Sequence, residues 1–151
     1  MKIEHDKVTP FLWYEKDAAE AAKLYVSLFP NSQVEEANPM MVTFTLAGRR
    51  FLALNGGPHY KATPAFSMFV RCEDQREVDE LWEKLMAGGG KEDRCGWMRD
   101  RFGLSWQICP VRLLELLSHK DRAIASKAQA AMMKMQKIDI AELERAVAAD
   151  T

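Results

Sequence analysis

The sequence contains no long hydrophobic run and no basic block. None of its segments approaches the ~20 consecutive apolar residues that a membrane-spanning helix requires, and the N-terminal stretch MKIEHDKVTP has no apolar signal core. Its 21 basic and 22 acidic residues give a formal net charge of −1 and form no cluster that would follow a phosphate backbone. We therefore expect a cytoplasmic protein that binds neither membranes nor nucleic acid.

Cysteine and histidine are also scarce, with three of each. Cys72, Cys95 and Cys109 lack CxxC spacing and lie in or beside apolar runs, so we expect reduced thiols and no disulfide framework. No two histidines share a metal-ligand spacing, and none adjoins a recognisable nucleophile motif. The sequence therefore identifies no catalytic residue.

The chain does contain one pattern written twice: a strand, a helix and three further strands. A loop-like segment with glycine and proline, residues 55–64, separates the two copies. Strands are predicted where β-branched and aromatic residues run together between turn residues. They span residues 8–14, 32–37, 41–47 and 50–54 in the first copy, and 65–72, 91–94, 95–100 and 104–109 in the second.

Helices are predicted from capping boxes, in which an Asp precedes a Glu by three residues. Asp17 begins a helix in the first copy, and Asp74 begins one in the second. After Pro110 the composition changes to Ala, Met, Lys and Leu with helical periodicity, and Asp139 begins a last helix. Met-rich amphipathic helices adapt to irregular surfaces, so this tail either packs on its own sheet or a partner subunit, or it offers a docking site.

These elements predict an α+β fold in which two β-α-β-β-β modules form a curved mixed sheet. We place one domain at residues 1–118, with modules at about 7–55 and 65–110, and a helical C-terminal extension at residues 119–151. In the second module, the segment WMRDRFGLSWQICP pairs a polar turn with an apolar strand that Gln107 interrupts. Such an amide either satisfies core groups or points into a pocket.

Four stretches carry a family resemblance: VTPFLWYEKDAAEAAKLYVSLF, LALNGGP, FSMFVRCEDQREVDELWEKL and GWMRDRFGLSWQICP. In this order they resemble the PhnB-like branch of the glyoxalase, or vicinal-oxygen-chelate, superfamily, which is often labelled 3-demethylubiquinone-9 3-methyltransferase. The resemblance covers about Lys7 to Pro110 and continues into KMQKIDIAELERA. It implies the glyoxalase/bleomycin-resistance fold, with a cleft between half-sheets that holds a divalent metal and a small substrate. We also expect a homodimer.

The metal is where this sequence departs from the resemblance. Carried over onto this chain, the ligand positions fall near Pro10, Asn55, Phe66 and Gln107, and none of them is a histidine or a carboxylate. Proline and phenylalanine cannot coordinate a metal, and two neutral amides cannot offset the dehydration of the ion. We therefore expect no metal and no cofactor.

The methyltransferase label also finds little support in the residues. Binding of S-adenosylmethionine usually uses a Gly-rich loop that leads from a strand into a helix. Gly56-Gly57 reads as a turn between modules, and Gly88-Gly89-Gly90 reads as the end of a helix. Neither glycine run opens a helix.

Asn55 and Gln107 are the candidate polar groups of a ligand cleft, unless they satisfy each other or the backbone in a filled barrel. The candidate cleft residues that accompany them are apolar: Phe11, Trp13, Phe66, Met68, Trp97 and Trp106. The first hypothesis is a metal-independent protein that binds a small-molecule ligand in an apolar cleft. The alternatives are an enzyme acting on a small aromatic or quinone-like substrate, in which an amide polarises a carbonyl, and a dimeric scaffold with a filled cleft.

Overall fold

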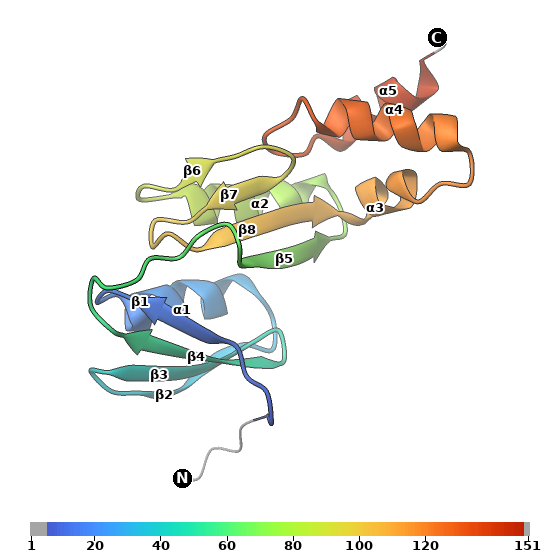
Figure 1. Ribbon diagram of the computed structural model, residues 1–151. Coiled ribbons are helices and arrows are strands. Elements are labelled where there is room, and N and C mark those ends of the chain that lie inside the picture. Colours follow the sequence, from blue (N-terminus) through green and yellow to red (C-terminus); the bar gives the residue numbers. More distant parts are fainter. Residues whose placement is uncertain (1–5, 150–151) are drawn as a thin grey trace. The chain divides into compact units, whose positions relative to one another are not determined.

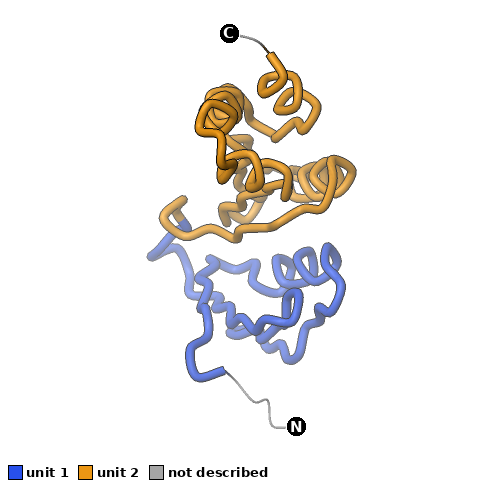
Figure 2. Tube along the Cα trace, turned by 90° about the vertical axis from the view of Figure 1, so that its right-hand side faces the viewer, with its two compact units in different colours: residues 1–62 blue, residues 63–151 orange. Residues whose placement is uncertain are grey.

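The doubled β-α-β-β-β pattern is present in the computed structural model of the protein, which describes residues 6–149 (Figure 1). Residues 1–5 and 150–151, which the predicted domains include, lie outside the described residues. The chain divides into two compact units, Met1–Ala62 and Thr63–Thr151 (Figure 2). Each unit contains a four-stranded mixed sheet, so the predicted α+β class is confirmed.

The first unit is a sheet with one helix packed on it, and its strand order is β1-β4-β3-β2. β1 runs parallel to β4, and the other neighbours are antiparallel. β1 starts at Phe11, later than predicted, because Pro10 has no N–H and offers only its carbonyl, which accepts from the Leu52 amide at 3.0 Å. The elements are β1 (Phe11–Tyr14), α1 (Ala18–Leu28), β2 (Gln33–Ala37), β3 (Met41–Leu46) and β4 (Arg49–Asn55).

The start of α1 differs from the prediction. Asp17 stands at the N-cap, but its side chain makes no capping hydrogen bond, so the predicted capping box is wrong. The first helical amide, Ala18 N–H, instead donates to Asn55 Oδ1 at 2.9 Å. The end of β4 therefore caps the helix. Farther along α1, the Tyr25 ring packs against Phe44 of the sheet at a ring-centroid distance of 6.2 Å.

The second unit repeats this arrangement with strand order β5-β8-β7-β6, in which β5 is parallel to β8. The second and third strands of this unit in chain order, β6 and β7, are shorter than predicted. Cys95 and Gly96, which lie between them, have φ of 60° and 85° and turn the chain ahead of β7. The elements of its module are β5 (Ser67–Cys72), α2 (Gln75–Met86), β6 (Lys91–Glu92), β7 (Trp97–Arg99) and β8 (Ser105–Pro110).

α2 covers one face of the second sheet (Figure 1). Met68, Met98 and Trp106 are aligned in register on neighbouring strands of that face, and each is at most 9% exposed. The predicted cap at Asp74 is confirmed, because its side chain accepts from the Glu77 amide at 2.9 Å. This layer of strand and helix side chains is the core of the second module.

The predicted helical tail is confirmed by three helices after β8: α3 (Val111–Leu117), α4 (Arg122–Met132) and α5 (Ile140–Ala148). Their apolar faces pack around Cys109 of β8. The other buried members of this cluster are Leu113, Leu116, Ala128, Ile138 and Leu143. The tail therefore packs within its own unit. In the part of the chain that the structure describes, no helix has the length and apolar content needed to cross a bilayer.

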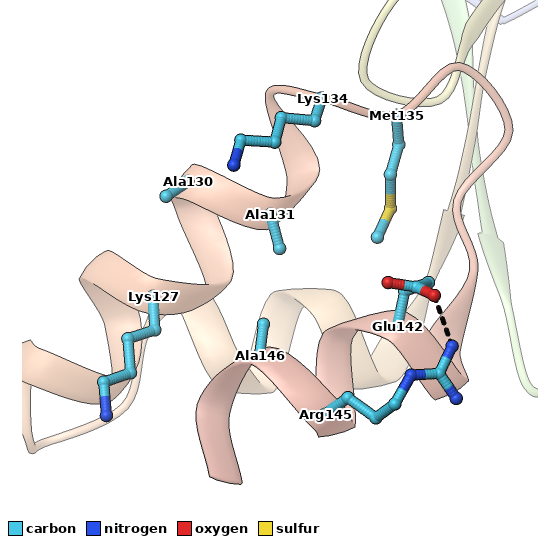
Figure 3. Close-up of a pocket in the computed structure, with 8 residues that line it drawn as sticks. All are labelled: Lys127, Ala130, Ala131, Lys134, Met135, Glu142, Arg145 and Ala146. Carbon is cyan, nitrogen blue, oxygen red and sulfur yellow. Dashed lines mark hydrogen bonds and ion pairs between the residues drawn. The ribbon is translucent and has the colours of Figure 1, made fainter. Parts of the chain in front are cut away.

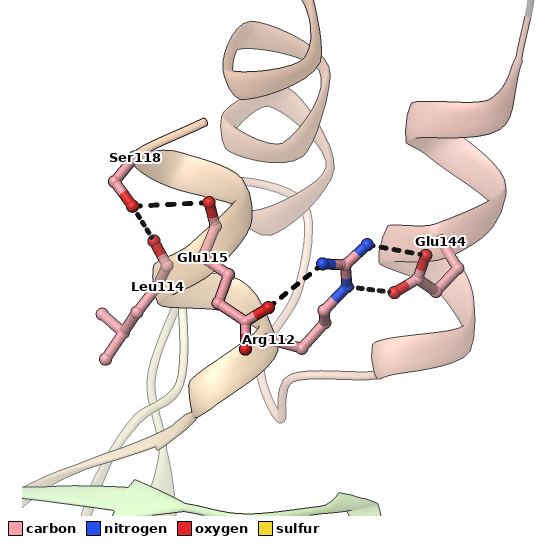
Figure 4. A network of polar contacts seen from close by, with 5 residues as sticks. All are labelled: Arg112, Leu114, Glu115, Ser118 and Glu144. Atoms are coloured by element: carbon pink, nitrogen blue, oxygen red, sulfur yellow. Dashed lines mark hydrogen bonds and ion pairs between the residues drawn. The ribbon is translucent and has the colours of Figure 1, made fainter. Parts of the chain in front are cut away.

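Polar contacts fix the tail in place. The Gln75 side chain, at the start of α2, donates to the Ile138 carbonyl at 2.9 Å and accepts from the Ile140 amide at 2.8 Å. Arg112 of α3 donates to both carboxylate oxygens of Glu144 on α5, at 2.5 and 3.4 Å (Figure 4). These contacts join α2, α3 and α5 into one framework.

Candidate functional site

The second sheet has polar and aromatic side chains on the face opposite α2. Successive strand residues point to opposite faces, so Gln107 lies on the face away from the buried Trp106. The strand registers align Gln107 with Phe69 on β5 and Trp97 on β7, and they align Ser105 with Ser67 and Arg99. We call these six residues the outer face: Ser67, Phe69, Trp97, Arg99, Ser105 and Gln107.

Hydroxyl and amide groups form the polar part of the outer face. Gln107 Nε2 donates to Ser67 Oγ at 2.9 Å, and the Ser67 hydroxyl keeps a proton of its own to donate. Ser105 is 1% exposed, and its Oγ has no hydrogen-bond partner among the described residues. An unpaired buried hydroxyl costs about 1–3 kcal/mol.

Two aromatic side chains flank Gln107. Phe69 is 52% exposed and Trp97 is half-buried. They stand on strands that have β8 between them, so their backbones are about 10 Å apart, at two interstrand spacings. The strand register therefore places one aromatic residue on each side of Gln107.

The turn before β8 fixes the position of this strand. Asp100 is 3% exposed and accepts through Oδ1 from the Phe102 amide at 2.9 Å and the Leu104 amide at 3.1 Å. Its Oδ2 accepts from Trp106 Nε1 at 2.9 Å. Gly103 completes the turn with φ of 92°, a conformation that disfavours other residues. A buried network of hydrogen bonds centred on Asp100 therefore holds Trp106, the residue next to Gln107.

Three predicted cleft residues of the second unit lie elsewhere. Met68 and Trp106 are a register pair on the α2 side, where both are buried in the core. Phe66 precedes β5 and is 46% exposed. Of the predicted residues in this unit, the outer face brings together Gln107 and Trp97.

Phe11 and Trp13 form an aromatic surface of the first unit. Side chains alternate along β1, and the alternate residues Leu12 and Tyr14 are buried on the side of α1. Phe11 and Trp13 therefore lie on the opposite face of the strand. Trp13 Nε1 donates to the Gly57 carbonyl at 3.0 Å. Its ring meets Tyr60 edge-on at 5.0 Å, so Trp13 is held by the loop that follows β4.

Asn55 serves the backbone of the first unit. Its Oδ1 accepts from the Ala18 amide at 2.9 Å, and its Nδ2 donates to the Pro39 carbonyl at 3.0 Å. Both ends of the amide are therefore hydrogen-bonded to main-chain groups. This is the backbone-satisfying alternative that the sequence left open for Asn55.

The donor atoms do not fit the divalent ion that the superfamily resemblance implies. Pro10 and Phe66 carry no side-chain donor, and the amide of Asn55 is hydrogen-bonded to the backbone at both ends. Gln107 leaves a single amide oxygen, a weak ligand for a metal ion. Across residues 6–149, no group of three or more His, Cys, Asp or Glu side chains is placed to hold a metal.

The thiols offer no activated nucleophile in the core. All three cysteines are free, as predicted. Burial raises the pKa of Cys72 to about 12, with a further contribution from Glu77, and burial raises the pKa of Cys109 to about 11. Because the thiolate is the reactive form, these two cysteines are inert at neutral pH.

Four residues of the outer face lie outside the predicted set: Ser67, Phe69, Arg99 and Ser105. The alternation in SMFVRC and SWQICP is a local signal that identifies one face of each strand. Which positions become neighbours depends on the pairing of β5 with β8, which are distant in sequence and parallel. Local periodicity does not contain that register.

Comparison with known proteins assigns the family. Residues 6–109 match the family described as 3-demethylubiquinone-9 3-methyltransferase. The chain is 32% identical to a PhnB protein from Bacillus cereus that carries the same description, over 70% of this chain and 99% of that one, with a TM-score of 0.62. No protein with a curated description matches the sequence.

Two further solved structures share the fold. A protein from Pseudomonas aeruginosa is 18% identical over 70% of this chain and 97% of its own, with a TM-score of 0.55. A glyoxalase-related enzyme from Fulvimarina pelagi is 16% identical over 70% of this chain and 88% of its own, with a TM-score of 0.50. The family match covers both modules up to one residue before the end of β8, whereas α3, α4 and α5 follow it. The chain belongs to the family described as 3-demethylubiquinone-9 3-methyltransferase, which its match to the PhnB protein also supports.

Proposed function

We propose that the protein binds a small planar molecule on the outer face of its second sheet, without a metal held by the protein. The observation that carries this proposal is the register that sets Gln107 between Phe69 and Trp97. A planar ring stacks on the two aromatic side chains, and its carbonyl or hydroxyl group meets the Gln107 amide. The aromatic pair gives affinity, and the amide gives orientation.

Ser67, Ser105 and Arg99 form a second row of the outer face, next to the row that contains Gln107. This second row supports a ligand that carries oxygen atoms. Ser67 offers a hydroxyl proton, and Arg99 adds a positive charge at the end of the same row. Ring carbonyls, such as those of a quinone, have this chemistry, and the family description names a quinone. The six side chains include no carboxylate, imidazole or thiol that could take a proton, which supports binding over turnover.

Titration with tetramethylbenzoquinone, which has no free ring position for thiol addition, tests the proposal. We expect quenching of tryptophan fluorescence and saturable binding by calorimetry, and no binding of cyclohexanone. Gln107→Leu should weaken binding by up to about tenfold through loss of one hydrogen bond. Gln33→Leu, a matched amide change on the exposed strand β2, should leave affinity unchanged. Equal affinities for the two variants would reject the proposed role of Gln107.

Metal independence has its own measurement. We expect the same affinity before and after dialysis against EDTA, because the donors near the superfamily's ligand positions are two neutral amides. Elemental analysis of protein purified without an affinity tag should find substoichiometric metal. Stoichiometric zinc, nickel or manganese, with loss of binding after chelation, would contradict this part of the proposal.

We further propose that the protein acts as a homodimer in the cytoplasm. Exposed apolar side chains in the first unit, Phe11 at 52% and Met40 at 60%, support a protein–protein contact. Sedimentation velocity should give twice the 17.2 kDa mass of the chain. Phe11→Ser should shift the mass toward a monomer.

A further inference from the structure

α4 and α5 enclose a groove on the surface of the second unit, after the residues that match the family. Its volume of about 680 Å³ lies in the range of ligand-binding cavities. Figure 3 shows Ala131 of α4 and Ala146 of α5 pointing toward one another across it, with Met135 at one end. Two alanines are too short to fill the space between the helices, so an apolar floor stays open. We call this the α4–α5 groove.

The groove is held in shape before any partner arrives. Asp121 caps α4 by accepting from the Ala123 amide at 3.0 Å, and Asp139 caps α5 by accepting from the Glu142 amide at 3.2 Å. Lys127 Nζ donates to the Ala149 carbonyl at 2.5 Å, which ties α4 to the end of α5. A preformed groove lowers the entropic cost of binding.

The edges of the groove are mostly positive. Lys127, Lys134 and Arg145 line it together with a single acid, Glu142. Glu142 is paired with Arg145, whereas Lys134 is exposed and its side chain makes no hydrogen bond or ion pair with the described residues. The lining therefore carries a net positive charge, although the chain as a whole has a net charge of −1. An occupant with acidic groups beside an apolar surface is complementary to it.

We infer that the α4–α5 groove binds an acidic amphipathic helix of a partner protein. The groove lies between two helices, and three of its lining residues are exposed: Ala130, Lys134 and Arg145. A small ligand normally buries most of its surface in its site, whereas a helix lays one apolar stripe into such a groove and leaves its other face in water. Apolar residues at i, i+3, i+4 and i+7 contact Ala131, Met135 and Ala146, and flanking acids contact the lysines.

A synthetic peptide tests this inference. The probe is a fluorescein-labelled peptide of about 15 residues, with Leu at i, i+3, i+4 and i+7 and Glu at the flanking positions. Fluorescence anisotropy with the full chain should show saturable binding. The same peptide with Lys in place of Glu should not bind. Lys134→Glu should weaken binding by about fivefold or more, and Ala130→Trp, which fills the groove from an exposed position, should abolish it.

Lys120→Glu is the matched control, since it makes the same charge change at an exposed position away from the groove. Its affinity should equal that of the unmodified chain. Circular dichroism of each variant reports whether the helices are intact. The inference is overturned if the Lys-substituted peptide binds equally well, if Lys134→Glu and Lys120→Glu have the same effect, or if sodium decanoate binds in a Lys134-dependent way while the peptide does not. Conversion of a dimer to a monomer by Ala130→Trp, without peptide binding, would assign the groove to a second copy of the chain.

Discussion

Trp106 Nε1 donates a 2.9 Å hydrogen bond to Asp100 Oδ2, and both residues are buried. The bond joins the turn before β8 to a core residue of the same strand. Because Gln107 follows Trp106 and points to the opposite face, the contact that anchors the core also sets the position of the outer face. Core packing and the proposed binding surface therefore depend on the same carboxylate.

Asp100→Asn should destabilise the protein by about 2 kcal/mol. The amide cannot accept from the Phe102 and Leu104 amides and from Trp106 Nε1 at once, because one of its two ends is a donor. Urea denaturation measures the loss. The control is Asp93→Asn, an exposed position whose carboxylate accepts from the adjacent Arg94 amide, and its loss should be below about 0.5 kcal/mol. Equal losses would contradict the anchoring role of Asp100.

Asn55→Ala should cost about 1–2 kcal/mol of stability, because the first amide of α1 and the Pro39 carbonyl both lose their partner. Hydrogen exchange should become faster at the Ala18 amide. Affinity for a ligand on the outer face should not change. A loss of affinity at full stability would instead make Asn55 a ligand-binding residue.

Gly56→Ala should cost about 1–3 kcal/mol and displace Trp13. A Cβ at Gly56 would lie 2.3 Å from the nearest atom of the Trp13 ring. Near-ultraviolet circular dichroism reports the movement of the ring. Gly57→Ala is the matched control: its Cβ meets nothing within 4 Å, but φ of 84° strains the backbone by about 1 kcal/mol. Its near-ultraviolet spectrum should be unchanged.

Thiol titration with Ellman's reagent at pH 8 should show one accessible cysteine per native chain. Burial raises the pKa of Cys72 to about 12 and of Cys109 to about 11, so both are protonated at that pH. Cys95 is half-exposed and should react first. In denaturant all three should react. The Cys95→Ser variant should lose the native reaction, and retention of it would show that the core opens.

The contribution of the Arg112–Glu144 pair should depend on pH. Hydrogen bonding to Arg112 holds the pKa of the Glu144 carboxyl below its usual range. The pair therefore contributes its stability above the pKa of an unfolded glutamate and loses it as pH falls through the lowered folded pKa. Both side chains are more than one-third exposed, so the contribution at pH 7 should be at most about 1 kcal/mol.

Thermal unfolding of Glu144→Gln and the unmodified chain at several pH values tests this prediction. Their melting temperatures should differ at pH 7 and converge at acid pH. Glu115→Gln is the control, because Glu115 meets the same guanidinium at a longer 3.3 Å and is more exposed. A constant difference between the two proteins across the pH range would contradict the assignment.

Local signals predicted the elements well where the signal and its structural cause lie close together in the sequence. Asp74 and Asp139 cap their helices, as their spacing to the next glutamate predicts. The same reasoning was wrong at Asp17, because Asn55 supplies the capping oxygen from a strand distant in sequence. A residue pattern cannot reveal a competitor that only the folded sheet brings near.

Less of the candidate site could be predicted, because the site also depends on contacts between residues that are distant in sequence. Gln107 and Trp97 lie in one short hairpin, whose turn chemistry and alternation can be read locally. Phe69 joins them through a parallel pairing that has no hairpin to set its register. Met68 and Trp106 are residue types that also line ligand pockets, so residue type alone does not separate pocket from core. Only the packing of α2 over them identifies them as core residues.

The tail also has a consequence for how the protein is made. The Cys95 and Gly96 amides donate to the Met135 and Gln136 carbonyls at 2.8 and 2.7 Å, in addition to the two bonds of Gln75. The first module can complete its hydrogen bonds while synthesis continues, whereas the second cannot do so until residues 135–140 have left the ribosome. During that interval Cys109 and the apolar end of β8 are uncovered. We therefore expect the second unit to be more prone than the first to aggregation and chaperone binding during synthesis.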